Sequence, residues 1–221
     1  MNEMLFLLHL VLASLFIWPF MRLGKSGFIC WICLQPILAN LFVLKQIVLF
    51  GFQVTCSDVY AVSTALGLNL LQEYYGKESA KQAVWISFMC LVFFVAMSFM
   101  HLVYTASERD YTQHAYQLIL SATPRLVAAS VFSFFCVQWL DVQLFGFLKT
   151  KAHRLSLFSR NIISLSVSQC LDTLLFTFLG LWGLVSQLFD VFFISFIIKL
   201  SVALLLSLST LRKGRYEQLS V

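Results

Sequence analysis

Charge is what this sequence has least of. Only 11% of its 221 residues are charged, whereas a soluble globular domain carries about 25%. Hydrophobic residues make up 60% of the chain, phenylalanine alone occurs 23 times, and they form long runs. A soluble globular fold is therefore excluded, and residues 1–221 are expected to form a single all-α integral membrane domain.

The residue patterns of several other protein classes are also missing. No Walker motif occurs, so the chain does not hydrolyse ATP itself. The four histidines lie apart, near segment ends or in loops, and form no metal-binding cluster. The six cysteines are scattered, and Cys30 and Cys33 lie in an apolar segment, where packing explains them better than a redox role. No metal, cofactor or disulfide framework is expected.

One short string resembles an enzyme motif. Gly24-Lys25-Ser26-Gly27 matches the GxSG pattern of rhomboid intramembrane proteases. We place it in a basic loop rather than at a buried helix start. The one mid-sequence histidine, His101, is expected near the external end of its span. The sequence therefore does not predict an enzyme.

Seven apolar segments are each long enough to cross a bilayer, which takes about 20 residues. The predicted polytopic helical protein has spans at 4–22, 28–50, 55–75, 82–105, 117–148, 155–182 and 187–211. The first is expected to be a retained helix, because no basic region precedes it and no cleavage site follows. The fifth is long enough to tilt or to begin as an external helix, with Pro124 as a candidate break.

Lysine and arginine are divided unequally between the two sets of connecting loops. With seven spans, Arg109 lies on one side and ten basic residues lie on the other: Arg22, Lys25, Lys77, Lys81, Lys149, Lys151, Arg154, Arg212, Lys213 and Arg215. Cytoplasmic loops carry the excess of these residues. The N-terminus is therefore expected outside and the C-terminus in the cytoplasm, a layout that suits a bacterial inner membrane.

The third span is too polar to face lipid. It contains Asp58, Asn69, Gln72 and Glu73, and charge at membrane depth is costly enough to be kept mainly where it binds or moves something. Asn69 and Glu73 are four residues apart and share a helix face. We expect them to line a cavity for a polar solute, near its cytoplasmic side.

Spans five and six contain two similar segments. QWLDVQLFGFL (138–148) and QCLDTLLFTFL (169–179) are identical at seven of eleven positions, and each begins with Gln-x-Leu-Asp, from Gln138 and Gln169. Consecutive spans run antiparallel, so the segments would form an inverted repeat, an architecture that places a site at the repeat interface. Chance similarity between two Leu/Phe-rich helices is the alternative.

The repeat also predicts two crossed ion pairs. Asp141 and Arg160 lie at similar distances from the intervening turn, and Asp172 and Arg125 lie farther out at comparable depth. The predicted pairs are therefore Asp141–Arg160 and Arg125–Asp172. They could be structural pairs that hold the helices together, or groups that bind or gate a solute, and both interpretations stay open.

Polar motifs recur along the chain in a fixed order: Asn40-x4-Lys45, Gly67-Leu-Asn69-x3-Glu73-Tyr-Tyr-Gly76-Lys77, Pro124-Arg125-x3-Ala129-Ser130, Gln138-x2-Asp141, Arg160-Asn161 and Ser168-Gln169-x2-Asp172. In these motifs the sequence, from about Gly24 to Gly183, resembles the queuosine precursor transporter family. One position departs from the family's usual pattern, because Asn69 stands where an aspartate is usual.

The resemblance implies a single transporter domain that imports a deazaguanine base for tRNA modification: queuine, or its cyano- or aminomethyl-substituted precursors. A carboxylate suits the donors on a guanine-like edge, and Gln, Asn and Arg suit its remaining groups. The residues expected to bind it are Asn69, Glu73, Arg125, Gln138, Asp141, Arg160, Gln169 and Asp172. A homodimer is compatible with this interpretation, and nucleic acid is not an expected partner.

Two other functions stay open at this point. The chain could be a substrate-binding membrane subunit that relies on a separate ATPase, or a carrier for another purine-like or vitamin-like solute. A structural or assembly factor would leave the charges within the spans unexplained. Neither the preferred base nor a coupling ion follows from the sequence.

Overall fold

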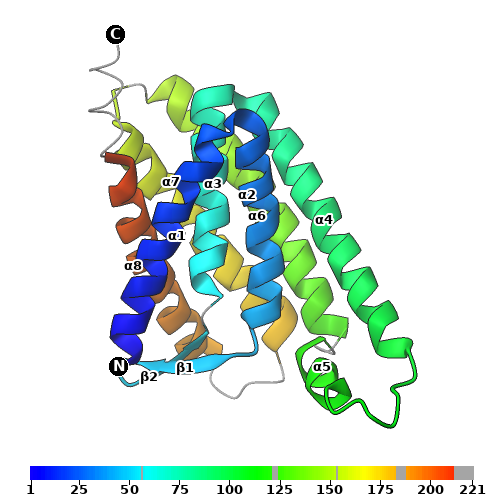
Figure 1. The fold of residues 1–221 in the computed structure, drawn as a ribbon. Coiled ribbons are helices and arrows are strands. Elements are labelled where there is room, and N and C mark those ends of the chain that lie inside the picture. Colours follow the sequence, from blue (N-terminus) through cyan, green and yellow to red (C-terminus); the bar gives the residue numbers. More distant parts are fainter. Residues whose placement is uncertain (56, 121–123, 153, 183–187, 212–221) are drawn as a thin grey trace.

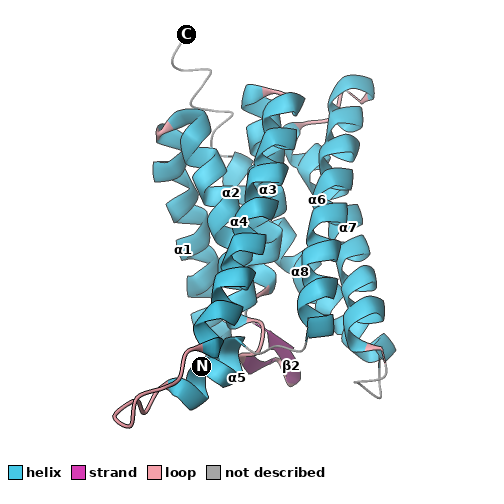
Figure 2. Cartoon of the chain, turned by 90° about the vertical axis from the view of Figure 1, so that its right-hand side faces the viewer, coloured by secondary structure: helices cyan, strands magenta, loops and turns pink. Residues whose placement is uncertain are grey.

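The structure, a computed structural model, describes residues 1–55, 57–120, 124–152, 154–182 and 188–211. These residues form one helical bundle (Figures 1 and 2). Its long helices are α1 (Asn2–Arg22), α2 (Gly24–Phe42), α3 (Asp58–Tyr75), α4 (Lys77–Val103), α6 (Pro124–Lys151), α7 (Leu157–Phe176) and α8 (Leu188–Leu211). Shorter elements are the strands β1 (Gln46–Leu49) and β2 (Phe52–Thr55), the helix α5 (Gln113–Leu120) and a π-helical turn, η1 (Thr177–Leu181).

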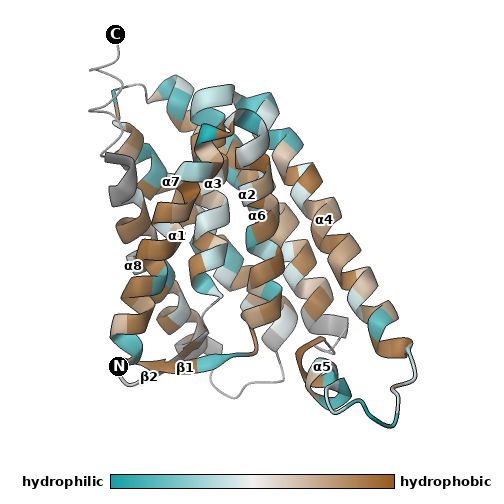
Figure 3. Cartoon of the chain, viewed as in Figure 1, coloured by the Kyte–Doolittle hydropathy of each residue, from teal (hydrophilic) through white to brown (hydrophobic). Residues whose placement is uncertain are grey.

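Five helical segments are long and apolar enough to cross a membrane: Asn2–Arg22, Gly24–Phe42, Lys77–Val103, Val127–Lys151 and Leu157–Gly180. Figure 3 shows α1 and α4 to be hydrophobic along most of their length. The prediction of a helical, multi-pass membrane protein is confirmed. The count of seven spans stays a prediction, because α3 is not among these five and the apolar segment described within α8, Phe192–Ser207, is shorter.

The second span ends earlier than predicted. Helix α2 stops at Phe42, and an antiparallel hairpin follows in which Leu49 pairs with Phe52. The two turn residues, Phe50 and Gly51, have φ values of 50° and 87°, as a tight two-residue hairpin turn requires. The sequence predicts a helix up to residue 50 because periodicity does not distinguish a helix from a strand in a short apolar run.

Two other boundaries differ from, or sharpen, the prediction. The fifth span is divided into the short helix α5 and the long helix α6, which begins at Pro124. Proline suits a first helical position, where its missing N–H costs nothing, so the predicted break at Pro124 is confirmed. The loop predicted at 24–27 is wrong, because this segment is the first turn of α2 and Gly27 is buried.

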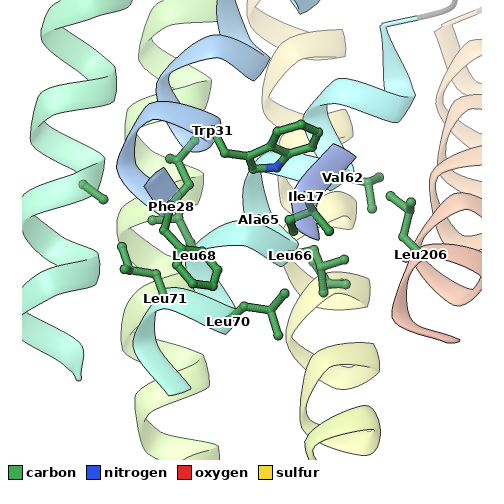
Figure 4. Packing of buried hydrophobic residues seen from close by; sticks show 14 of the residues in the cluster. Ile17, Phe28, Trp31, Val62, Ala65, Leu66, Leu68, Leu70, Leu71 and Leu206 are labelled. Carbon is green, nitrogen blue, oxygen red and sulfur yellow. The ribbon is translucent and has the colours of Figure 1, made fainter. Parts of the chain in front are cut away.

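Helix α3 lies at the centre of the bundle, and most of its residues are buried. Its apolar side packs against α1, α2, α4 and α8 in the cluster that Figure 4 shows. At Gly67, an added Cβ would lie 3.1 Å from Ile32 and 3.2 Å from Trp31, so α2 and α3 are in close contact there. The prediction that this polar helix avoids lipid is confirmed by its burial.

The ends of the bundle differ in composition. The turns α1–α2, α3–α4 and α6–α7 lie at one end, whereas the N-terminus, the hairpin and α5 lie at the other (Figure 1). The first group of turns carries most of the basic residues that the sequence assigned to one side: Arg22, Lys25, Lys77, Lys81, Lys149, Lys151 and Arg154. The alternation of the helices therefore gathers these charges at one end, which we call the basic end.

A polar seam as the candidate functional site

Asp141 lies fully buried on the side of α6 that faces α7. The hydroxyl groups of Ser164 and Ser168, one turn apart on α7, both donate to its Oδ1 atom at 2.6 Å. The second oxygen, Oδ2, is buried and has no hydrogen-bond partner among the described residues. The two serines therefore fix the orientation of the carboxylate, and its Oδ2 atom remains available to accept a hydrogen bond.

Helix α3 reaches the same region through Gln72. Its Nε2 atom donates to the main-chain oxygen of Val142 at 3.1 Å, beside Asp141. A Cβ added at Gly146 would lie 2.7 Å from that Nε2, so the glycine allows the close approach of α3 to α6. Asn69 lies three residues before Gln72 and shares its side of α3.

Several buried amides in these three helices also lack partners. We define the polar seam as the side chains of Asn69, Gln72, Gln138, Asp141, Asn161, Ser164, Ser168 and Gln169, none more than 4% exposed. No partner among the described residues is found for the side-chain oxygens of its five amides, nor for the nitrogens of Asn69 and Asn161.

Such a concentration of unpaired groups is unusual in a folded protein. Most buried polar atoms are hydrogen-bonded, and each one left without a partner costs about 1–3 kcal/mol. A polar ligand entering between α3, α6 and α7 would satisfy several of these atoms at once. The polar seam therefore has the donors and acceptors of a binding site for a solute with many hydrogen-bonding groups.

An ion-pair cluster lies beside the seam toward the basic end. The Glu73 carboxylate is 2.9 Å from Arg160 Nη2 and 3.3 Å from Lys149 Nζ. Lys149 also donates to the main-chain oxygens of Gln72 and Glu73, and the Arg160 guanidinium lies over the Phe145 ring. These three charged residues, named the Glu73 cluster, tie α3 to α6 and α7.

A second cluster joins α3, α7 and α8. The Lys199 ammonium lies 2.6 Å from Asp172 Oδ2 and 3.9 Å from Asp58 Oδ1. Asp58 is the first residue of α3 and Glu73 lies in its last turn. These three residues, named the Lys199 cluster, therefore tie the N-terminal end of α3 to α7 and α8. The polar seam lies on α3, α6 and α7, helices that the two clusters connect.

The predicted Asp141–Arg160 pair is wrong, because the two residues lie at different depths. Helix α6 continues to Lys151, which places Asp141 about 15 Å from its end at 1.5 Å per residue, whereas Arg160 lies about 5 Å into α7. Arg160 instead binds Glu73. For the second crossed pair, the described partner of Asp172 is Lys199, and the Arg125 side chain lies outside the described residues.

The predicted binding residues thus divide into three groups. Asn69, Gln138, Asp141 and Gln169 belong to the polar seam, Glu73 and Arg160 form an ion pair, and Asp172 belongs to the Lys199 cluster. The prediction omitted these contributors: Asp58, Gln72, Lys149, Asn161, Ser164, Ser168 and Lys199. Of these residues, Lys199 is the easiest to identify from the sequence, because a lysine within an apolar span requires a partner.

The two similar segments of α6 and α7 do not have equivalent surroundings. Consecutive helices run antiparallel, as expected (Figure 1). However, Asp141 accepts from two serines, whereas Asp172 accepts from a lysine of α8. Any repeat in these segments therefore does not extend to the chemistry of their aspartates.

Comparison with known proteins identifies relatives of this chain. Residues 55–212 match the family described as "Putative vitamin uptake transporter". A protein of Bacillus subtilis (strain 168), named "Probable queuosine precursor transporter", is 31% identical over 204 residues, which cover 90% of this chain and 87% of the relative. No solved structure matches. The family match includes the polar seam and both ion-pair clusters.

Proposed function

This chain belongs to the vitamin uptake transporter family, and from this premise we propose that it imports a queuosine precursor of the deazaguanine type. Family membership makes it a membrane transporter rather than an enzyme. The substrate is proposed from the name of the Bacillus subtilis relative together with the chemistry of the polar seam.

The unpaired Asp141 Oδ2 is the observation that carries this proposal. A guanine-like ring presents an N–H and an exocyclic amino group side by side, and a carboxylate oxygen is a strong acceptor for such donors. Asn69, Asn161 and the seam glutamines offer both acceptors and donors to the remaining ring edges. Ser164 and Ser168 would hold the carboxylate in a fixed orientation while it binds.

The composition of the seam also favours one kind of precursor. Asp141 is its one carboxylate, since Asn69 is neutral and Glu73 is paired with two cations. A base with a cationic arm would need a second carboxylate. We therefore expect the neutral, cyano-substituted base to be taken up in preference to the aminomethyl-substituted one.

We further propose the membrane orientation that the basic end suggests. With the excess of lysine and arginine in the cytoplasm, the N-terminus and the hairpin would face outward. The host membrane would be the inner membrane of a bacterium. A reporter fused to the C-terminus should then be active only on the cytoplasmic side, and activity confined to the outer side would reverse the assignment.

Complementation tests the proposed function. A bacterial strain that neither makes nor imports precursors should regain queuosine in its tRNA when it expresses this chain and is supplied with the base. Each base is supplied separately, and Glu108→Gln, in the exposed loop before α5, serves as the matched carboxylate control. Absence of queuosine with every base, despite confirmed membrane expression, would refute the proposal.

Reconstitution of the purified chain separates a self-sufficient carrier from a subunit of an ATP-driven importer. Proteoliposomes that contain only the purified chain should exchange internal for external base without ATP. Exchange that required an added ATPase would favour the subunit interpretation instead.

A further inference from the structure

The Lys199 cluster is largely buried and carries a net charge. The side chains of Lys199 and Asp58 are each 8% exposed and that of Asp172 is 21% exposed. Two carboxylates and one ammonium give a formal charge of −1. Low-dielectric surroundings penalise an uncompensated charge, so one further positive charge would make the buried cluster neutral.

The geometry identifies the carboxylate that would take this charge. Asp172 Oδ2 lies 2.6 Å from the ammonium, which is the distance of a strong, charge-assisted hydrogen bond. Asp58 Oδ1 lies 3.9 Å away, too far for such a bond. Asp58 is therefore the less compensated of the two carboxylates.

A proton suits this place better than a metal ion. The Lys199 ammonium already lies between the two carboxylates, where a sodium or calcium ion would need room and several more oxygen ligands. No group of three or more His, Cys, Asp or Glu able to hold a metal occurs among the described residues. A proton needs only one carboxylate oxygen.

The other titratable groups near the N-terminal end of α3 do not neutralise the charge of Asp58. On α1, the His9 ring packs edge-on against Tyr60 at 5.1 Å. Lys45, after α2, and His101, on α4, are both exposed to the surroundings. On α6, Arg125 has no described side chain. Within the described residues, Lys199 and Asp172 are thus the charged groups that face Asp58.

The cluster is mechanically connected to the polar seam. Asp58 and Asn69 are eleven positions apart on α3, close to three full turns, so they share one side of the helix. Lys199 joins this side of α3 to α7, which carries Asn161, Ser164 and Ser168. If the seam opens by separation of α3 from α7 and α8 at this end, the contacts of Lys199 break and water reaches the cluster.

From these observations we propose that the Lys199 cluster is the proton-coupling site, with Asp58 as the group that binds the proton. This inference rests on the proposed transport function. When the outer end is open and hydrated, the cluster tolerates its charge of −1. Binding one proton to Asp58 makes the cluster neutral and favours its burial, so the outer end closes over the substrate. When the cytoplasmic end opens, water that enters the polar seam reaches Asp58 along the same side of α3 and accepts the proton, which leaves with the substrate on the cytoplasmic side.

Transport by the full chain in proteoliposomes tests this inference, with tritiated cyano-substituted deazaguanine as the probe. Exchange of internal for external base at equal pH reports transport alone. Accumulation driven by an inside-alkaline gradient reports proton coupling, and one proton per base can support about tenfold accumulation for each pH unit. Asp58→Asn should abolish accumulation and retain exchange, and Glu108→Gln should retain both.

The outcomes distinguish the two proposals. If the wild-type chain exchanges no base, the proposed function is wrong. If it exchanges base but accumulates none with a pH gradient, or accumulates it only with a sodium gradient, the coupling inference is wrong. Accumulation by Asp58→Asn at the wild-type level would also overturn it.

A measurement that does not depend on transport completes the test. Infrared difference spectra of the purified chain between acidic and alkaline pH should contain the carbonyl band of a buried carboxylic acid. That band should be lost in Asp58→Asn and kept both in Glu108→Gln and in Asp141→Asn, which lacks the buried carboxylate of the seam. If Asp58→Asn does not fold, Asp58→Ser replaces it. Absence of the band from the wild-type chain would overturn the inference.

Discussion

The Glu73 cluster and the Lys199 cluster bind the two ends of the same helix in opposite ways. The Glu73 cluster has two cations for one carboxylate, and its side chains are 11–35% exposed. The Lys199 cluster has two carboxylates for one cation, and its side chains are 8–21% exposed. The Glu73 cluster lies at the basic end of the bundle, and the Lys199 cluster lies at the opposite end of α3.

This difference indicates that the two clusters have different tasks. The side chains of the Glu73 cluster are on average less buried than those of the Lys199 cluster, so separating them costs less. Removing one partner from a buried pair costs about 3–5 kcal/mol. Under the proposed function, the Glu73 cluster therefore suits the end of the pathway that opens at low cost. The Lys199 cluster suits an end that opens when the charge of the cluster changes.

The largest expected effect follows from Lys199→Gln. This substitution leaves two carboxylates buried side by side, and the unfolding free energy should fall by about 3–5 kcal/mol. Thermal unfolding of the detergent-purified chain measures the loss. Adding Asp172→Asn should recover part of it, because one carboxylate is then removed. A single variant as stable as the wild type would show that the cluster is not buried in the membrane-embedded protein.

Asp141→Asn should reduce uptake more than stability. Ser164 and Ser168 can still donate to the asparagine oxygen, but the free oxygen and its charge are lost. Hydrogen bonds to charged groups contribute about 1.5–3 kcal/mol, so base affinity should fall by about tenfold to 100-fold. Unfolding temperature and uptake measured on the same preparation separate the two effects. A large loss of folded protein with normal uptake per molecule would contradict this role.

Glu73→Gln should have an intermediate effect. It keeps the shape of the side chain and leaves Arg160 and Lys149 unpaired beside the seam. We expect a several-fold loss of uptake in proteoliposomes and a smaller loss of stability than for Lys199→Gln, because the Glu73 cluster is less buried than the Lys199 cluster. The Glu73→Gln, Arg160→Gln double variant should be less impaired than the two losses combined. Wild-type uptake by the single variant would make Glu73 purely structural.

The smallest effect is expected at a surface pair. Lys81 and Glu78 are 2.7 Å apart, but the Glu78 side chain is 84% exposed. Glu78→Gln should change the unfolding free energy by less than about 0.5 kcal/mol and leave uptake unaltered. A loss comparable to that of Glu73→Gln would mean that charge at the basic end, rather than the Glu73 cluster, controls opening.

The sequence predicted the parts of the fold that depend on local properties. The break at Pro124 and the burial of the polar third span both follow from single segments, since proline geometry and the cost of charge in lipid need no tertiary information. The hairpin at 46–55 was missed because its strands are as apolar as the helix before them.

The pairing of charges could not be predicted in the same way. Arg160 was assigned to Asp141 from its distance to the turn, but the depth of each residue depends on where α6 and α7 end. Lys199 binds residues of α3 and α7, which are separated from it in sequence by tens of residues and by other helices. The two serines that donate to Asp141 likewise depend on how α6 and α7 pack, which the sequence does not specify.

Direct binding to the purified chain tests the central claim, that the polar seam around Asp141 binds the substrate. The cyano-substituted base should raise the unfolding temperature of the wild-type chain and of Glu108→Gln in a concentration-dependent manner. Asp141→Asn should still be folded and monodisperse, but the same stabilisation should need about tenfold to 100-fold more base. If Asp141→Asn is stabilised at the same base concentrations as the wild type, the substrate binds elsewhere and the account of the seam is wrong.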